Sequence, residues 1–232
     1  MGFVNYAHRG ASEYAPENTL LAFNMGIYMG ANGIETDVQL TRDGVPVLFH
    51  DDTLARVTGE AGSVSDYTFA ELQNFRVRNN GLEDRILRLE DFLRFFGFRD
   101  MRFALELKQK GTALPVAEMV RAHGLQDKVV ITSFDWEELC AMRKIAPELE
   151  TGFLCKAVDD ALIAQLKQWG IVELCPPAKL LDADNVAAWK AQGLRVRAWG
   201  VKNETLMRSA YDAGADGMTV NFPDKLTEYM KK

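Results

Sequence analysis

Residues 33–52 read GIETDVQLTRDGVPVLFHDD, and this stretch decides the fold. Apolar and polar residues alternate in its first part, which predicts a β-strand because successive strand side chains point to opposite faces. The Asp43-Gly44 pair then predicts a two-residue hairpin turn, after which the chain returns as a second arm. Counting back from that turn sets His50 opposite Asp37, on the same face of the hairpin.

The polar face of this hairpin predicts a functional site. Glu35 and Asp37 are two residues apart and therefore share a face, and the hairpin register adds the imidazole of His50 to them. Clustered charges are costly to remove from water unless they are paired or bind a metal. We therefore expect this patch to serve chemistry and not stability.

The rest of the chain alternates regularly between strand and helix patterns. Such alternation predicts parallel strands and an α/β fold. We expect strands at residues 3–8, 102–107, 129–134, 151–155, 171–175, 195–199 and 217–220, and helices at residues 19–31, 89–98, 114–123, 136–144, 160–169, 183–192 and 204–213.

If the second arm of the hairpin is an antiparallel extension, eight parallel strands remain, which predicts a (β/α)8 TIM barrel. We expect one domain over residues 1–232, with a small insertion at about residues 51–85, after His50. A doubly wound sheet is the alternative fold. No G-x-G-x-x-G segment follows the first strand, as a dinucleotide site in such a sheet would require.

Composition narrows the classes of partner and the compartment. The chain has 232 residues and a net charge of −6, which argues against nucleic acid as a partner. Its cysteines, Cys140, Cys155 and Cys175, are odd in number and widely spaced, as expected for reduced thiols of a cytoplasmic protein. No signal peptide or long apolar segment is evident, so no stable membrane association is expected. The oligomeric state is not indicated.

In a TIM barrel, functional groups lie where the strands end at their carboxyl side. The side chains at these positions are His8, Arg9, Glu35, Asp37, Glu106, Lys108 and Trp199, with His50 returned by the hairpin. A single acid in a strand is as often a solvated edge as a ligand, but three acids on neighbouring strands at one height suit a hard divalent cation. Two imidazoles beside such an ion could supply an acid and a base for displacement at phosphorus. Arg9 and Lys108 could neutralise phosphate charge, and Trp199 either stacks on a substrate headgroup or caps the barrel mouth.

These segments together resemble the glycerophosphodiester phosphodiesterase family. The matching motifs are HRG at 8–10, PENT at 16–19, IETDVQLTRDG at 34–44, LFHD at 48–51, LELK at 105–108, TSF at 132–134 and AWGVKN at 198–203. The resemblance implies a TIM barrel that hydrolyses glycerophosphodiesters to sn-glycerol 3-phosphate and an alcohol. It implies a bound Ca²⁺ or Mg²⁺ as well, and carboxylate ligands would also accept Mn²⁺.

By this resemblance His8 and His50 are the acid–base pair, and Glu35, Asp37 and Glu106 are the metal ligands. Which histidine is the acid, and whether water or a substrate hydroxyl attacks, stays open. The chain departs from the family pattern at Gly200, where threonine is usual, and at Asn221, where aspartate is usual. It also has Leu87-Arg88 where Ile-Pro-Thr is usual. Two alternatives remain: a lysophospholipid phosphodiesterase acting on lipids, and a non-catalytic barrel that binds phosphodiesters.

Overall fold

The computed structural model describes residues 2–231 and contains a closed barrel of eight parallel strands. These strands are β1 (Val4–His8), β2 (Gly33–Leu40), β6 (Arg102–Leu107), β7 (Val129–Ser133), β8 (Glu150–Leu154), β9 (Glu173–Cys175), β10 (Arg195–Val201) and β11 (Gly217–Val220). The order β1-β11-β10-β9-β8-β7-β6-β2 closes because β1 also pairs with β2. The predicted TIM barrel is confirmed, and the doubly wound alternative is wrong because that sheet has open edges.

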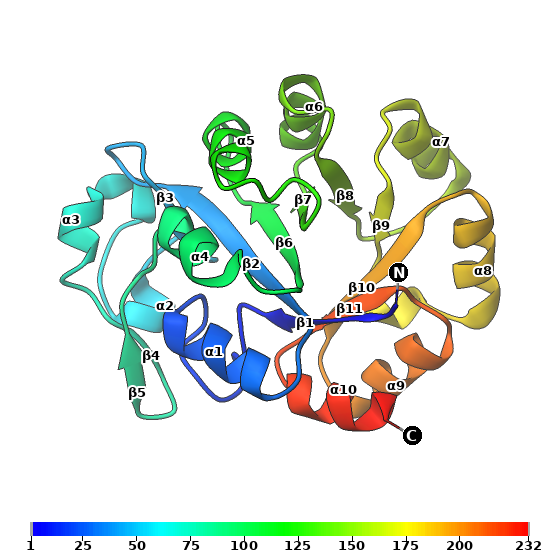
Figure 1. Cartoon of the computed structure of the whole chain (residues 1–232), viewed down its shortest axis with the longest axis horizontal. Coiled ribbons are helices and arrows are strands. Elements are labelled where there is room, and N and C mark those ends of the chain that lie inside the picture. Colours follow the sequence, from blue (N-terminus) through cyan, green and yellow to red (C-terminus); the bar gives the residue numbers. More distant parts are fainter. Residues whose placement is uncertain (1, 232) are drawn as a thin grey trace.

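Helices surround this barrel as an outer ring (Figure 1). They are α1 (Leu20–Tyr28), α4 (Leu89–Phe96), α5 (Ala113–Ala122), α6 (Trp136–Ile145), α7 (Asp160–Gln168), α8 (Ala183–Ala191), α9 (Glu204–Asp212) and α10 (Pro223–Met230), with a short 3-10 turn η2 (Ala178–Leu180) before α8. Asp135, Asp159 and Asp182 each accept a backbone N–H at the start of a helix, the usual N-cap arrangement. No helix within residues 2–231 has the length and apolar character needed to cross a membrane.

The hairpin differs from its predicted register by one residue. Strand β3 (Pro46–Leu48) pairs antiparallel with β2, with Val38 opposite Leu48. Thr41 N–H donates to the Val45 carbonyl over 3.1 Å, so residues 42–44 form a three-residue loop in place of the expected two-residue turn. Gly44 takes φ +77°, as in a type I turn followed by a bulge. The prediction that His50 pairs opposite Asp37 is therefore wrong.

Instead, Phe49 lies opposite Asp37 and donates its N–H to the Asp37 carbonyl over 3.0 Å, while His50 lies beyond the end of β3. The buried Gln39 side chain fixes the path of the backbone where it leaves β3. Its amide donates to the carbonyls of Phe49 (3.0 Å) and Asp51 (2.9 Å), on either side of His50.

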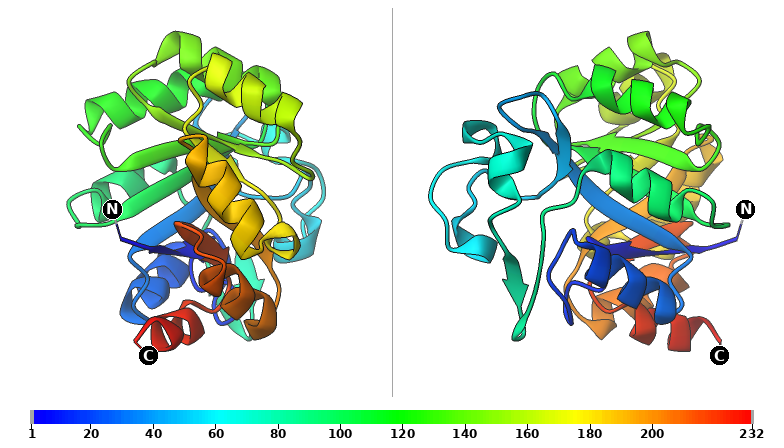
Figure 2. Two further views of the ribbon diagram at one scale, coloured as in Figure 1. Left: turned by 90° about the vertical axis from the view of Figure 1, so that its right-hand side faces the viewer. Right: turned by 60° about the vertical axis from the view of Figure 1, so that its left-hand side comes forward.

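Between β3 and α4 the chain forms several short elements at the end of the barrel where the strands finish (Figure 2). These are α2 (Ala55–Thr58), η1 (Val64–Asp66), α3 (Phe69–Leu72), β4 (Val77–Asn79) and β5 (Leu82–Asp84). They bury a second hydrophobic cluster, separate from the main core, made of Val47, Phe49, Leu54, Val57, Val64, Leu72, Val77 and Ile86. The Asn79 amide of the β4–β5 hairpin donates to the Ser12 carbonyl over 2.9 Å, so this hairpin braces the loop after β1.

Candidate active site

The loop after β1 carries the first site residues in a constrained backbone. Arg9 and Asn18 both have positive φ, +56° and +58°, which non-glycine residues adopt rarely and mostly at functional sites. Between them, Gly10 has φ +82°, and a Cβ there would lie 2.5 Å from the Ala22 carbonyl carbon. Only glycine fits this close approach, which turns the loop back over the barrel.

Three buried carboxylates lie at the centre of the site. Glu35, Asp37 and Glu106 offer oxygen atoms within 4.8 Å of one another. In the β2–β6 register Asp37 is level with Glu106, whereas Glu35 is level with Ala104, so the prediction that all three lie at one height is wrong. The set still converges because the Glu35 side chain reaches the others. Burial and the neighbouring carboxylates raise the pKa of Glu35 well above its usual value.

Two cations flank these carboxylates. Arg9 Nε lies 3.1 Å from Asp37 Oδ2, and Lys108 Nζ lies 2.8 Å from Glu106 Oε1 and 3.8 Å from Asp37 Oδ1. Burial raises the pKa of Asp37, but the positive charges of Arg9 and Lys108, together with His50 and a hydrogen bond from Asn18, outweigh it and the net shift is downward. The Asn18 amide also donates to Asp37 Oδ2 over 2.9 Å, which helps to hold Asp37 as a carboxylate.

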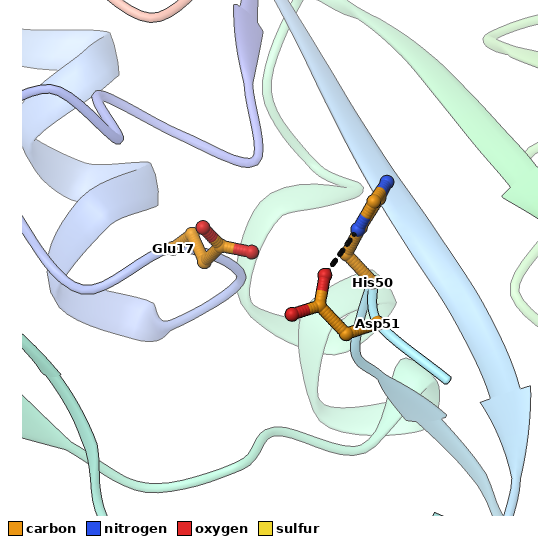
Figure 3. A group of neighbouring side chains, drawn as sticks. All are labelled: Glu17, His50 and Asp51. Carbon is orange, nitrogen blue, oxygen red and sulfur yellow. Dashed lines mark hydrogen bonds and ion pairs between the residues drawn. The ribbon is translucent and has the colours of Figure 1, made fainter. Parts of the chain in front are cut away.

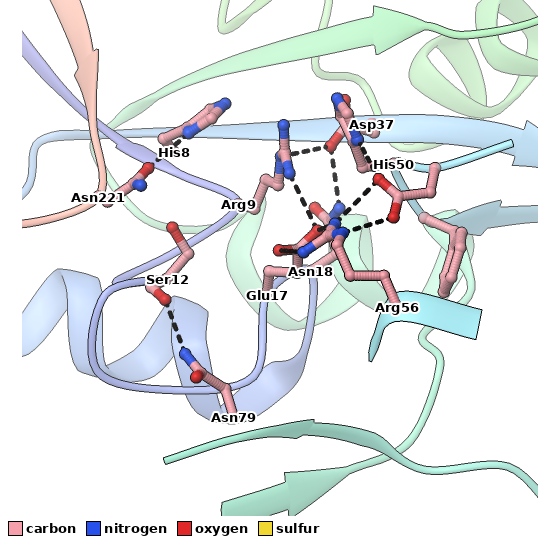
Figure 4. A network of polar contacts seen from close by, with 12 residues as sticks. His8, Arg9, Ser12, Glu17, Asn18, Asp37, His50, Arg56, Asn79 and Asn221 are labelled. Carbon is pink, nitrogen blue, oxygen red and sulfur yellow. Dashed lines mark hydrogen bonds and ion pairs between the residues drawn. The ribbon is translucent and has the colours of Figure 1, made fainter. Parts of the chain in front are cut away.

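His8 is held by a neutral partner. Its Nδ1 lies 2.6 Å from Oδ1 of Asn221, which follows β11 at the far end of the chain (Figure 4). In this geometry Nδ1 donates its proton and Nε2, 3.8 Å from Glu35 Oε2, keeps its lone pair. Burial and the adjacent Arg9 lower the pKa of His8 to about 4. The ring is therefore neutral at physiological pH.

His50 is held by an acidic partner. Its Nδ1 lies 2.6 Å from Asp51 Oδ1, and the opposite edge of the ring is turned away from Asp51 (Figure 3). Because a carboxylate only accepts hydrogen bonds, Nδ1 must carry the proton. Hydrogen bonding to Arg56 lowers the pKa of Asp51 to about 2, although partial burial opposes this shift, and the His50 bond contributes to the lowering.

These groups open into one cavity of about 420 Å³. The cavity is lined by six of the predicted site residues, His8, Arg9, Glu35, His50, Glu106 and Trp199. The other two, Asp37 and Lys108, adjoin this lining through their contacts with Arg9 and Glu106. The structure therefore brings the predicted site residues together. Part of the lining is apolar and includes Phe134, Leu154 and Trp199. There the Trp199 ring stands edge-on to Phe134, with 5.0 Å between ring centres, and its Nε1 donates to the Cys155 carbonyl.

Sequence reasoning overlooked several residues that contact the site. Glu17, Asp51, Arg56 and Phe134 all have side chains here, yet none was singled out, and Asn221 was noted only as a departure from the family pattern. Glu17, Asp51 and Phe134 lie inside three motifs that carry the family resemblance, at 16–19, 48–51 and 132–134. Arg56 carried no such signal because its partners lie at separate positions in the sequence.

Comparisons with known proteins agree with this geometry. The model of the glycerophosphoryl diester phosphodiesterase family matches residues 8–225. The chain belongs to this family. Among its relatives, the glycerophosphodiester phosphodiesterase of Bacillus altitudinis is 32% identical and that of Caldanaerobacter subterraneus 30%; these matches cover 97% of this chain and 98% and 97% of those proteins.

Solved structures of two other proteins have the same fold. A phosphodiesterase from Oleispira antarctica, in complex with the product sn-glycerol-3-phosphate, has a TM-score of 0.91 and 29% identity, and the match covers 99% of this chain and 97% of that one. A putative glycerophosphoryl diester phosphodiesterase from Silicibacter pomeroyi has a TM-score of 0.91 and 26% identity, covering 99% and 94%.

The donor set of this family member fits a divalent cation. Asp37 Oδ1 is buried and has no hydrogen-bond partner, which leaves its lone pairs available for a ligand. Three carboxylates are the ligand chemistry that Mg²⁺, Ca²⁺ and Mn²⁺ prefer. A second acidic group, Glu17 with Asp51, suits a cation less well because Arg56 already pairs with both carboxylates.

Proposed function

We propose that this phosphodiesterase hydrolyses glycerophosphodiesters to sn-glycerol 3-phosphate and an alcohol, by acid–base catalysis at a divalent metal site. One observation carries the proposal: a single cavity is lined by two imidazoles, each held at Nδ1, and holds a buried carboxylate cluster with cations beside it. The similarity to a phosphodiesterase bound to sn-glycerol-3-phosphate supports the choice of substrate.

His8 acts as the general base in this proposal. The neutral Asn221 amide holds Nδ1 and leaves the Nε2 lone pair available. The attacking hydroxyl, of water or of the substrate's own glycerol, gives its proton to Nε2 as its oxygen bonds to phosphorus.

His50 acts as the general acid. The Asp51 carboxylate can stabilise a positive charge on this ring, which the Asn221 amide cannot do for His8. In this role the His50 ring is the imidazolium, protonated on both nitrogens. As the bond between phosphorus and the leaving oxygen breaks, Nε2 gives its proton to the alkoxide, and Nδ1 keeps its hydrogen bond to Asp51. Arg9 and Lys108 offset the charge on the phosphoryl oxygens.

Glu35, Asp37 and Glu106 are proposed to hold the cation. When bound, a divalent ion would neutralise negative charge that develops on the phosphoryl oxygens. Mg²⁺ and Ca²⁺ are the first candidates, with Mn²⁺ as a third. Trp199 is proposed to contact the substrate headgroup from the apolar part of the cavity lining. That the protein is cytoplasmic and that it has no nucleic-acid partner remain predictions from the sequence.

The test is the release of sn-glycerol 3-phosphate from glycerophosphocholine by the wild-type protein and by His→Ala variants at each histidine. We expect His8→Ala and His50→Ala to lose roughly 10²–10⁴-fold in kcat. His123→Ala is the control because His123 caps the end of helix α5, away from the cavity. Loss of less than tenfold in either site variant would remove the acid–base assignment. Faster turnover of lysophosphatidylcholine than of glycerophosphocholine would favour the lipid substrate instead.

A further inference from the structure

Arg56 joins two parts of the site that are far apart in the sequence. It lies on α2, and its guanidinium makes two forks (Figure 4). One fork donates to Asp51, from Nε over 2.5 Å and from Nη2 over 2.9 Å. The other donates to Glu17, from Nη1 over 2.9 Å and from Nη2 over 2.7 Å.

Both carboxylates contact groups to which the mechanism gives a role. Asp51 accepts from His50 Nδ1, and Glu17 accepts from Arg9 Nη1 over 3.0 Å. An alternating series of charges therefore runs from His50 through Asp51, Arg56 and Glu17 to Arg9. Removal of Arg56 would release both carboxylates at once, and with them the orientation of the His50 ring.

This arrangement differs from an ordinary surface ion pair. The side chains of Glu17 and Asp51 are only 15% and 20% exposed, so their charges need a fixed partner, whereas exposed pairs contribute little. The flanking residues Leu54 and Val57 are buried in the second hydrophobic cluster, which fixes α2 independently of Arg56. A lysine cannot replace this contact because an ammonium is a point charge without a planar fork.

We propose that Arg56 is a positioning residue that orients His50 through Asp51 and Arg9 through Glu17. This inference rests on the proposed function, which makes His50 the general acid. The segment after β3 thereby has a part in the reaction, because α2 carries Arg56, which links the side of the site that holds His50 to the side that holds Arg9.

The first test compares Arg56→Ala and Arg56→Lys with the control Arg42→Ala. Arg42 is a matched control because its guanidinium also bridges two acceptors, the Asp66 carbonyl and the Glu71 carboxylate. The Arg42 side chain is 53% exposed, against 50% for Arg56. We expect both Arg56 variants to lose roughly 10- to 100-fold in kcat, with KM changed far less. Arg42→Ala should keep the wild-type kcat. Full activity in Arg56→Lys, or a higher KM at unchanged kcat in Arg56→Ala, would overturn the proposal, the latter in favour of direct substrate contact.

The second test reads the His50 ring directly and does not depend on turnover. Nitrogen-15 NMR of the imidazoles can be assigned by single His→Ala variants because the chain has 3 histidines. In the neutral form of the ring, we expect the wild-type protein to keep the remaining His50 proton on Nδ1, and Arg56→Ala to show a mixture of the two tautomers. An unchanged His50 spectrum in Arg56→Ala would overturn the positioning role. A wild-type protein that shows the expected spectrum but hydrolyses no glycerophosphodiester would contradict the proposed function alone.

Discussion

At the scale of single residues, the carboxylate group combines function with a cost in stability. Glu35, Asp37 and Glu106 crowd like charges in a buried position, and the adjacent Arg9 and Lys108 offset them in part. The raised pKa of Glu35, caused by burial and then by its acidic neighbours, reflects this conflict. A bound cation would relieve it. The site is therefore expected to be less stable without metal than with it.

Glu35→Gln tests this expectation through thermal stability. The change removes one charge at nearly constant volume, so we expect the Tm of the metal-free protein to rise by roughly 2–4 °C. The increase in Tm that Mg²⁺ gives the wild-type protein should disappear in the variant. Glu83→Gln, at a carboxylate with 57% exposure, is the control and should change neither value. A lower metal-free Tm with an unchanged response to Mg²⁺ would contradict the account.

The identity of these acids could be predicted from the sequence because strand periodicity fixes which side chains share a face. The groups that hold the histidines are harder to predict. His8 and Asn221 are 213 residues apart, and only closure of the barrel between β1 and β11 brings them together. Arg56 likewise acquires its partners from the tertiary fold.

At the scale of elements, the hairpin of β2 and β3 determines where His50 lies. The Asp-Gly pair correctly indicated a turn, but Thr41 changes its type. Thr41 Oγ1 accepts the Val45 N–H and lies 2.6 Å from Asp43 Oδ1, which favours the three-residue loop. The β4–β5 hairpin was not predicted, although its Asn80-Gly81 turn is a strong hairpin signal. Its strands are three residues each, too short to show alternation.

In denaturant unfolding, Asp43→Gly distinguishes the two turn types, and Gly44→Ala tests the left-handed conformation of Gly44. We expect Gly44→Ala to cost about 1–2 kcal/mol because an L-residue must enter the left-handed region. Asp43→Gly should also destabilise, since it removes the acceptor of the Thr41 hydroxyl and the Phe69 N–H. A two-residue type I′ turn would instead place Asp43 at positive φ and gain from glycine. Stabilisation by Asp43→Gly would therefore contradict the observed loop.

Gln39 is expected to couple the hairpin to catalysis. Gln39→Leu leaves two carbonyls beside His50 without their donor, so we expect a loss of roughly 1–3 kcal/mol in the free energy of unfolding. The kcat should fall at least about tenfold, as expected when a supporting contact of a catalytic group is lost. Gln73→Leu is the control, because Gln73 donates to the Ile86 carbonyl outside the cavity. It should lower stability only. Equal kcat values for the two variants would exclude the coupling.

At the scale of the whole molecule, a layer of ion pairs lies near the start of the barrel strands, below the proposed active site. Where the strands begin, Glu150 pairs with both Arg102 and Arg195, and Glu173 pairs with the buried Arg197 over 2.7 Å. The number and order of the barrel strands could be predicted from the strand–helix alternation. This ionic layer could not, because its five residues are spread over four different strands and carry no local signal.

Glu150→Gln tests this layer through the pH dependence of stability. Burial raises the pKa of Glu150, but the bonds from Arg195 and Arg102 outweigh it, so the net shift is below the usual 4.5. A carboxylate with a lowered pKa stabilises the fold above its unfolded-state pKa and loses that contribution as the pH falls. The stability difference between wild type and variant should therefore be largest near neutral pH and shrink as pH falls below about 4.5. A difference that stays constant across this range would contradict the assignment.

One measurement tests the central claim most directly: the rate of sn-glycerol 3-phosphate release from glycerophosphocholine by metal-stripped protein as Mg²⁺, Ca²⁺ or Mn²⁺ is added back. We predict no turnover without metal and recovery with at least one of these ions in the wild-type protein. Glu106→Gln should recover far less, and His50→Ala should stay inactive even where it binds the ion. Full turnover by the stripped protein, or no turnover with any of the three ions, would contradict the account.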